Sequence, residues 1–164
     1  MDYEKAVDFA GDERKALEAA RAALMQGGFR VSSIENGAFQ AECSGLFDTR
    51  RNPLLAASTI VVAVRDGELA LGAELEGVRK LKKFLTLFIG GMALLFLVGF
   101  GAFLLPQVLQ GKEHPAMLAL PLAPFTPWPV LGPVLVMATR IRAVKALDTL
   151  MENVRTIGEE APTE

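Results

Sequence analysis

The pattern of hydrophobic and polar positions divides the chain into a largely polar N-terminal part, two long apolar runs and a short amphipathic tail. From Asp12 to Gln26, Ala and Leu recur at spacings of three and four residues, which predicts an amphipathic helix. Most of its residues are strong helix formers, and Gly27 and Gly28 follow it as at many helix ends. Residues 3–9 are expected to add a short turn of helix before it.

Residues 29–76 alternate between apolar and polar side chains, which is typical of strands with one buried face. Asn36-Gly37 and Asp66-Gly67 are strong signals for two-residue hairpin turns. We therefore expect four antiparallel strands in a meander, with the preceding helix covering the apolar face. The solvent-facing side is expected to carry Arg30, Gln40, Glu42, Thr59, Arg65, Glu68 and Glu74. Together, residues 1–78 are predicted to form a cytoplasmic α+β domain.

Two uncharged runs follow, each long enough to cross a bilayer, which takes about 20 apolar residues. The first predicts a transmembrane helix over 84–110. The second contains six prolines between Pro115 and Pro133, and proline disrupts an α-helix interior. We expect an outer loop and Pro-rich segment over 111–128, partly non-helical, with Trp128 as an interfacial anchor. A second transmembrane helix that continues into a cytoplasmic helix is then expected over 129–157, and a single kinked helix over 116–139 is the alternative.

The end of the second run continues into a polar segment with apolar residues at helical spacing. The stripe consists of Ile141, Val144, Leu147, Met151 and Val154. We expect this cytoplasmic helix to pack onto its own domain rather than form a coiled coil, because it spans barely two heptads. Gly158 is expected to end it, leaving an acidic tail over 158–164. The predicted fold class is thus an α+β membrane protein with a two-helix transmembrane hairpin and a C-terminal amphipathic helix.

Basic residues cluster on the outer flanks of the two apolar runs and are nearly absent between them. A basic juxtamembrane segment covers residues 79–83. The flanking bases are Arg79, Lys80, Lys82, Lys83, Arg140, Arg142 and Lys145. By the positive-inside rule, both termini are expected in the cytoplasm and the short loop outside. The loop-poor layout favours a multi-pass protein of a bacterial inner (plasma) membrane.

Candidate chemistry is sparse along the chain. The single histidine, His114, and the single cysteine, Cys43, have no partner placed nearby by the sequence. We find none of the nucleotide, metal or nucleophile motifs that carry a mechanism, so no catalytic residue, metal or cofactor is predicted and an enzyme is not expected. Arg50 and Arg51 are the candidate contact for an anion or a partner, with an ordinary exposed loop as the alternative.

The expected function is that of a non-enzymatic membrane accessory or scaffold subunit whose cytoplasmic domain mediates protein–protein interaction. The alternatives are a homo-oligomeric membrane assembly or pore and a lipid- or anion-binding module at the membrane interface. The expected partners are the lipid bilayer and either another protein or a second copy of the chain. Nucleic acid is not expected as a partner, because the chain carries a formal net charge of −2.

Overall fold

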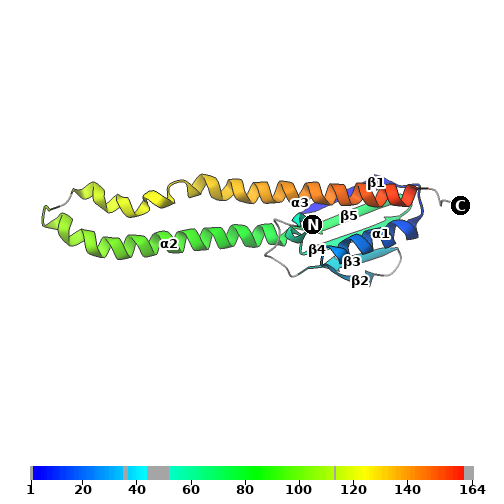
Figure 1. Ribbon diagram of the computed structural model, residues 1–164, viewed down its shortest axis with the longest axis horizontal. Coiled ribbons are helices and arrows are strands. Elements are labelled where there is room, and N and C mark those ends of the chain that lie inside the picture. The colour runs from blue at the N-terminus through cyan, green and yellow to red at the C-terminus, as the bar shows by residue number, and fades with distance from the viewer. Residues whose placement is uncertain (1, 35–36, 44–51, 113, 161–164) are drawn as a thin grey trace. The chain divides into compact units, whose positions relative to one another are not determined.

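The computed structural model describes residues 2–34, 37–43, 52–112 and 114–160 (Figure 1). The chain divides into two compact units. The first, here called the sheet unit, consists of Met1–Arg79 and Ala138–Glu164. The second, here called the apolar unit, is Lys80–Met137. The sheet unit therefore contains both ends of the chain, and the apolar unit is inserted between them.

The sheet unit is built on five antiparallel strands in the order β1-β5-β4-β3-β2. The strands are β1 (Tyr3–Asp8), β2 (Arg30–Ile34), β3 (Ala38–Glu42), β4 (Thr59–Arg65) and β5 (Glu68–Glu74). A short 3₁₀ helix, η1 (Pro53–Ala56), precedes β4. The expected meander of β2 to β5 is confirmed, and β1 adds a fifth strand along the free edge of β5.

The hairpin between β4 and β5 closes through two residues, Asp66 and Gly67. Both have positive φ, 54° and 79°, as a type I′ turn requires. The turn brings Arg65 opposite Glu68 and fixes the register of the whole pair. The sequence prediction of this turn is confirmed.

The expected turn of helix over residues 3–9 is wrong, because Tyr3–Asp8 forms strand β1. Its pairing with β5 places Tyr3, Lys5 and Val7 opposite Ala73, Leu71 and Leu69. These three side chains share the covered face of the sheet with their apolar partners, since directly opposed residues point to the same side. Six residues are too few to distinguish the two-residue repeat of a strand from the repeat of a helix, and it is the pairing with β5 that makes this segment a strand.

Two helices cover the apolar face of the sheet (Figure 1). Helix α1 (Glu13–Gln26) begins after Asp12, whose carboxylate accepts the backbone N–H groups of Arg14 and Lys15. The second cover is the C-terminal part of α3 (Trp128–Glu159). The fully buried side chains between these layers include Leu24, Ile60, Val62, Leu69 and Leu147. The expectation that the tail packs onto its own domain is confirmed.

The buried face of the tail is shifted from the predicted stripe. Leu147, Met151 and Val154 are buried as expected, whereas Ile141 is 56% exposed. The helix also continues to Glu159, so the expectation that Gly158 ends it is wrong. Gly158 lies against the ring of Phe9 and the methyl of Ala16, where a β-carbon would come within 2.6 Å of the ring. Close approach, and not helix termination, requires glycine at this position.

The apolar unit contains most of α2 (Glu76–Leu109), which begins directly after β5. Among the described residues it is the one helix long and apolar enough to cross a membrane by length and composition, and none of its most apolar window is buried. The basic residues expected as a separate juxtamembrane segment lie within its first turns. The remaining apolar residues form η2 (Pro115–Phe125), a 3₁₀ helix, and the start of α3.

The expected second transmembrane helix is not supported, because α2 is the one candidate span among the described residues, although α3 begins at Trp128, next to the predicted start at Pro129. The second apolar run is shared between η2 and α3. The prolines at 121 and 124 lie in η2, where their spacing of three matches the three residues per turn of a 3₁₀ helix. The rings of Phe125 and Phe96 meet edge to face at 5.5 Å, so the end of η2 contacts α2 within the apolar unit.

Candidate interaction surface

One face of the sheet has no cover within the described part of the sheet unit, since α1 and α3 both pack on the other side. We call it the open sheet face. It is formed by the residues that alternate with the buried ones along the strands. They are Glu4, Ala6, Asp8, Arg30, Ser32, Ala38, Gln40, Glu42, Thr59, Val61, Ala63, Arg65, Glu68, Ala70, Gly72 and Glu74. The sequence predicts the charged members of this set on β2 to β5, but neither Glu4 and Asp8 on β1 nor the apolar centre.

The centre of the open sheet face is apolar. Ala6, Ala70, Ala63 and Ala38 are directly opposed on four adjacent strands and form a row across the sheet. The methyl groups of this row are exposed or half-buried. With strands about 4.8 Å apart, the row spans about 14 Å. The solvent-facing side of an antiparallel sheet is ordinarily polar, so this apolar strip makes the open sheet face the candidate contact surface of the sheet unit.

The charges of the open sheet face lie around this strip and are unevenly distributed. Arg30 and Arg65 are each directly opposite an acid, Glu42 and Glu68 respectively. The β1–β5 half carries exposed acids and no base on this face, because Lys5 belongs to the covered side. The acids of that half are Glu4, Asp8, Glu68 and Glu74. The surface is therefore an apolar strip with one strongly acidic flank.

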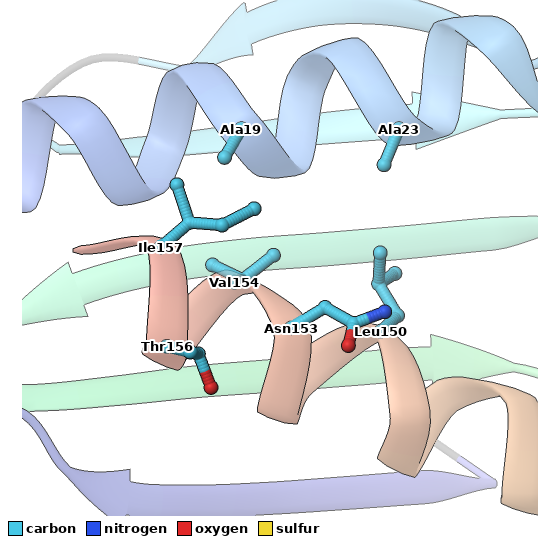
Figure 2. Close-up of a pocket in the computed structure, with 7 residues that line it drawn as sticks. All are labelled: Ala19, Ala23, Leu150, Asn153, Val154, Thr156 and Ile157. Carbon is cyan, nitrogen blue, oxygen red and sulfur yellow. The ribbon is translucent and has the colours of Figure 1, made fainter. Parts of the chain in front are cut away.

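A shallow groove of about 290 Å³ runs between α1 and the end of α3 on the covered side of the sheet unit (Figure 2). It is lined by Ala19, Ala23, Leu150, Asn153, Val154, Thr156 and Ile157. The small alanines of α1 leave the space that the larger side chains of α3 only partly fill. The amide of Asn153 and the hydroxyl of Thr156 are its polar groups, so it can accept an apolar side chain but carries no charged group for recognition.

A polar junction joins β1 to α3 on the covered side. The hydroxyl of Tyr3 donates a 2.8 Å hydrogen bond to Oδ1 of Asp148, and the ammonium of Lys5 donates to the same oxygen at 2.6 Å. The bond from Lys5, and then that from Tyr3, lower the pKa of the Asp148 carboxyl. Burial, and then the bond to Asp148, raise the pKa of Tyr3. The sequence does not reveal this junction because its residues are 145 positions apart.

The structure places the predicted site residues as follows. Arg50 and Arg51 lie outside the described residues, so their expected anion contact stays a prediction. Arg79 lies 3.5 Å from the carboxylate of Asp2. The other predicted flanking bases are exposed to solvent or half-exposed along α2 and α3. They are Lys80, Lys82, Lys83, Arg140, Arg142 and Lys145. None of these bases belongs to the open sheet face.

The remaining singled-out residues have ordinary surroundings. Trp128 is the first residue of α3 and is half-buried. His114 caps η2, since its Nδ1 accepts the backbone N–H of Ala116. Cys43 follows β3, and its backbone N–H donates to the carbonyl of Ser58. Within the described residues, no group of three His, Cys, Asp or Glu side chains could hold a metal ion.

Comparison of the chain with protein-family models, with curated proteins and with solved structures finds no match in any of the three. The account of its function therefore depends on the surfaces described above.

Proposed function

We propose that the protein is a non-enzymatic membrane subunit in which the apolar unit anchors the sheet unit at the bilayer and the sheet unit binds another protein. The observation that carries the protein-binding part is the open sheet face, where an apolar strip lies on a side of the sheet that is ordinarily polar. The helix α2 carries the membrane part.

The apolar side chains of α2 point outward on all sides. Leu87, Leu95 and Phe103 are 80%, 68% and 66% exposed. An uncharged helix that is apolar all round is stable where lipid or other apolar helices surround it. Its glycines Gly90 and Gly99 have nothing within 4 Å of an added β-carbon, so they leave room for such neighbours.

The sheet unit is assembled from chain segments on both sides of the apolar unit, which supports an even number of membrane crossings. Residues on both sides of the apolar unit belong to the sheet unit, and Asp148 is hydrogen-bonded to Tyr3 within it. A chain that leaves one folded unit across a bilayer and returns to the same unit has to cross back. If α2 is the outward crossing, the second apolar run supplies the return.

The second run has the length for that return. Its 3₁₀ part, η2, has 11 residues, which at about 2.0 Å per residue gives about 22 Å. The residues of α3 from Trp128 to Thr139 add about 18 Å at 1.5 Å per residue. Neither piece alone covers the hydrocarbon core of about 30 Å, and together they exceed it. We therefore propose that η2 is inserted, which moves Trp128 into the core from the interfacial position expected from the sequence.

The flanking bases set the orientation of this hairpin. Arg79, Lys80, Lys82 and Lys83 precede the first apolar run, and Arg140, Arg142 and Lys145 follow the second. By the positive-inside rule, the sheet unit and both termini are then on the cytoplasmic side of a plasma membrane. The residues around Gly111 then lie on the outer side.

Mild-detergent extraction from native membranes, followed by size measurement and mass spectrometry, tests the proposal. We expect a different protein to travel with the chain in fixed stoichiometry. An assembly of this chain alone that conducts ions in liposomes would favour the pore. A monomer without partners that binds anionic vesicles would favour the lipid-binding module. Either result would overturn the proposed accessory role.

A further inference from the structure

The open sheet face has the features that identify its binding partner by chemistry. The apolar row Ala6–Ala70–Ala63–Ala38 is flat, because each residue contributes a single methyl group. Val61 extends it by one step along the strands, directly opposite Gly72, which is buried and carries no side chain. A flat surface of small side chains lets a partner's larger apolar side chains approach the sheet closely.

The charge distribution limits what can cover this strip. On the open sheet face, the β1–β5 flank carries Glu4, Asp8, Glu68 and Glu74 and no base, with Arg65 of β4 directly opposite Glu68. Like charges repel across an interface, which excludes an anionic lipid surface and nucleic acid from this face. The same acids complement Lys and Arg, so a protein segment with basic residues beside an apolar stripe fits the surface.

We propose that the open sheet face binds an amphipathic helix of a partner protein. Its apolar stripe lies on the alanine row, and Lys or Arg on one side of that stripe lie over the acidic β1–β5 flank. The row of about 14 Å is wide enough for one helix, about 10 Å in diameter. The inference rests on the proposed function and specifies where, and to what, the sheet unit binds.

The orientation of the bound helix follows from the position of the acids. Glu4 and Glu74 lie on neighbouring strands at one side of the alanine row, and Asp8 and Glu68 lie at its other side. Both pairs belong to the β1–β5 half, whereas Arg30 and Arg65 lie on β2 and β4. A helix that lies along the strands, across the row, therefore has an excess of acids beneath one flank only, because on the far half the acid Glu42 is directly opposite Arg30. The partner's basic residues are expected on one flank only.

Site-specific photocrosslinking of the full chain in native membranes tests this inference. A benzophenone amino acid is placed at Ala63, the centre of the row, and in a second chain at Ala19, which lines the α1–α3 groove. The crosslinked peptide is identified by mass spectrometry. We expect at least a tenfold higher crosslink yield from position 63, and a partner peptide with an apolar stripe flanked on one side by Lys or Arg.

A charge-reversed pair supplies the specific readout. Glu4→Lys with Glu74→Lys changes the open sheet face, and Glu18→Lys with Glu152→Lys makes the same change of net charge on α1 and α3. We expect the first pair to reduce crosslinking from position 63 about tenfold and the second pair less than twofold. Raising the salt concentration on the unaltered chain should also reduce the yield, which covers the case in which a double variant fails to fold.

Each other outcome overturns the inference. Crosslinks from position 63 to lipid, to another part of the same chain or to a second copy would show a different occupant. A partner captured from position 19 instead would show that the contact is in the α1–α3 groove. A crosslink yield that is unaffected by charge reversal and by salt would show that basic residues of the partner do not contact the acidic flank. In these cases a partner that co-purifies in fixed stoichiometry leaves the proposed accessory function standing, so the two failures are distinguishable.

Discussion

The hydroxyl of Tyr3, in the first strand, donates a hydrogen bond of 2.8 Å to the carboxylate of Asp148, in the last helix. Lys5, two residues along the same strand, donates to the same oxygen. The junction joins segments that precede and follow the apolar unit. It therefore helps to hold the first strand and the last helix together in one folded unit, and the even number of crossings that we propose depends on both segments belonging to that unit.

Replacing Asp148 should reveal the junction through the pH dependence of stability. The pKa of this carboxyl is lowered by Lys5 and then by Tyr3, so its contribution is present above the ordinary value of about 3.9 and is lost as the pH falls through the lower folded value. We expect Asp148→Asn to lower the free energy of unfolding at neutral pH by under about 1 kcal/mol, since the side chains of Lys5 and Asp148 are 45% and 40% exposed. Chemical denaturation should show this difference shrinking as the pH falls below the ordinary carboxyl pKa and disappearing once Asp148 is protonated in the folded protein. A difference that persists there would contradict the assignment.

Tyr3 can be titrated by itself, because it is the only tyrosine of the chain. Burial, and then the bond to Asp148, raise its pKa, so its contribution to stability is present below the ordinary value of about 10 and is lost as the pH rises through the higher folded value. Absorbance of the tyrosinate should report ionisation well above that ordinary value. Asp148→Asn should lower the midpoint without restoring it fully, because burial is the larger cause. A midpoint at the ordinary value in the unaltered chain would show that Tyr3 is solvated.

Gly11 should not tolerate a side chain. A β-carbon there would collide with the backbone carbonyl of Gly158, in the segment where the N–H of Asp12 donates to the same carbonyl at 3.0 Å. We expect Gly11→Ala to destabilise the sheet unit by about 1–3 kcal/mol, because backbone atoms on both sides have to move. Gly91→Ala, with nothing within 4 Å of its added β-carbon, is the control and should be neutral or slightly stabilising. Equal stabilities of the two variants in denaturation would contradict the close contact.

The depth of Trp128 reports how much of the second apolar run enters the bilayer. It is the only tryptophan and begins α3, about 18 Å before Arg140 at 1.5 Å per residue. With Arg140 at the cytoplasmic interface, we expect its fluorescence to be quenched most by lipids brominated near the chain ends. Strongest quenching from bromine close to the headgroups would place Trp128 at an interface and η2 outside the core.

Local sequence signals predict the parts of this fold that local interactions decide. The helix predicted over 12–26 and the two-residue turn at Asp66-Gly67 require only neighbouring residues, and both are present. The alternation of apolar and polar residues along β2 to β5 likewise identifies the buried face of the sheet. Strand β1 is the counter-example, because Tyr3–Asp8 acquires its structure from β5, whose paired residues lie 60 to 70 positions away.

The open sheet face can likewise be predicted only in part from the sequence. The exposed charges Glu68 and Glu74 can be predicted from alternation, but the alignment of Ala6 with Ala70 and of Ala63 with Ala38 depends on strand register and order. Gly158 resembles a helix terminator in the sequence, whereas its role depends on Phe9, at the other end of the chain. Both features are set by tertiary contacts that no local pattern encodes.

The central claim, an even number of crossings with the sheet unit on one side, is tested most directly by cysteine labelling in sealed membrane vesicles. The single native cysteine, Cys43, is replaced by serine, and one cysteine at a time is placed at Glu4, Lys112 or Glu152. A reagent that cannot cross the bilayer should label positions 4 and 152 from the same side and position 112 from the opposite side. Labelling of positions 4 and 152 from opposite sides, or of all three from one side, would contradict the account.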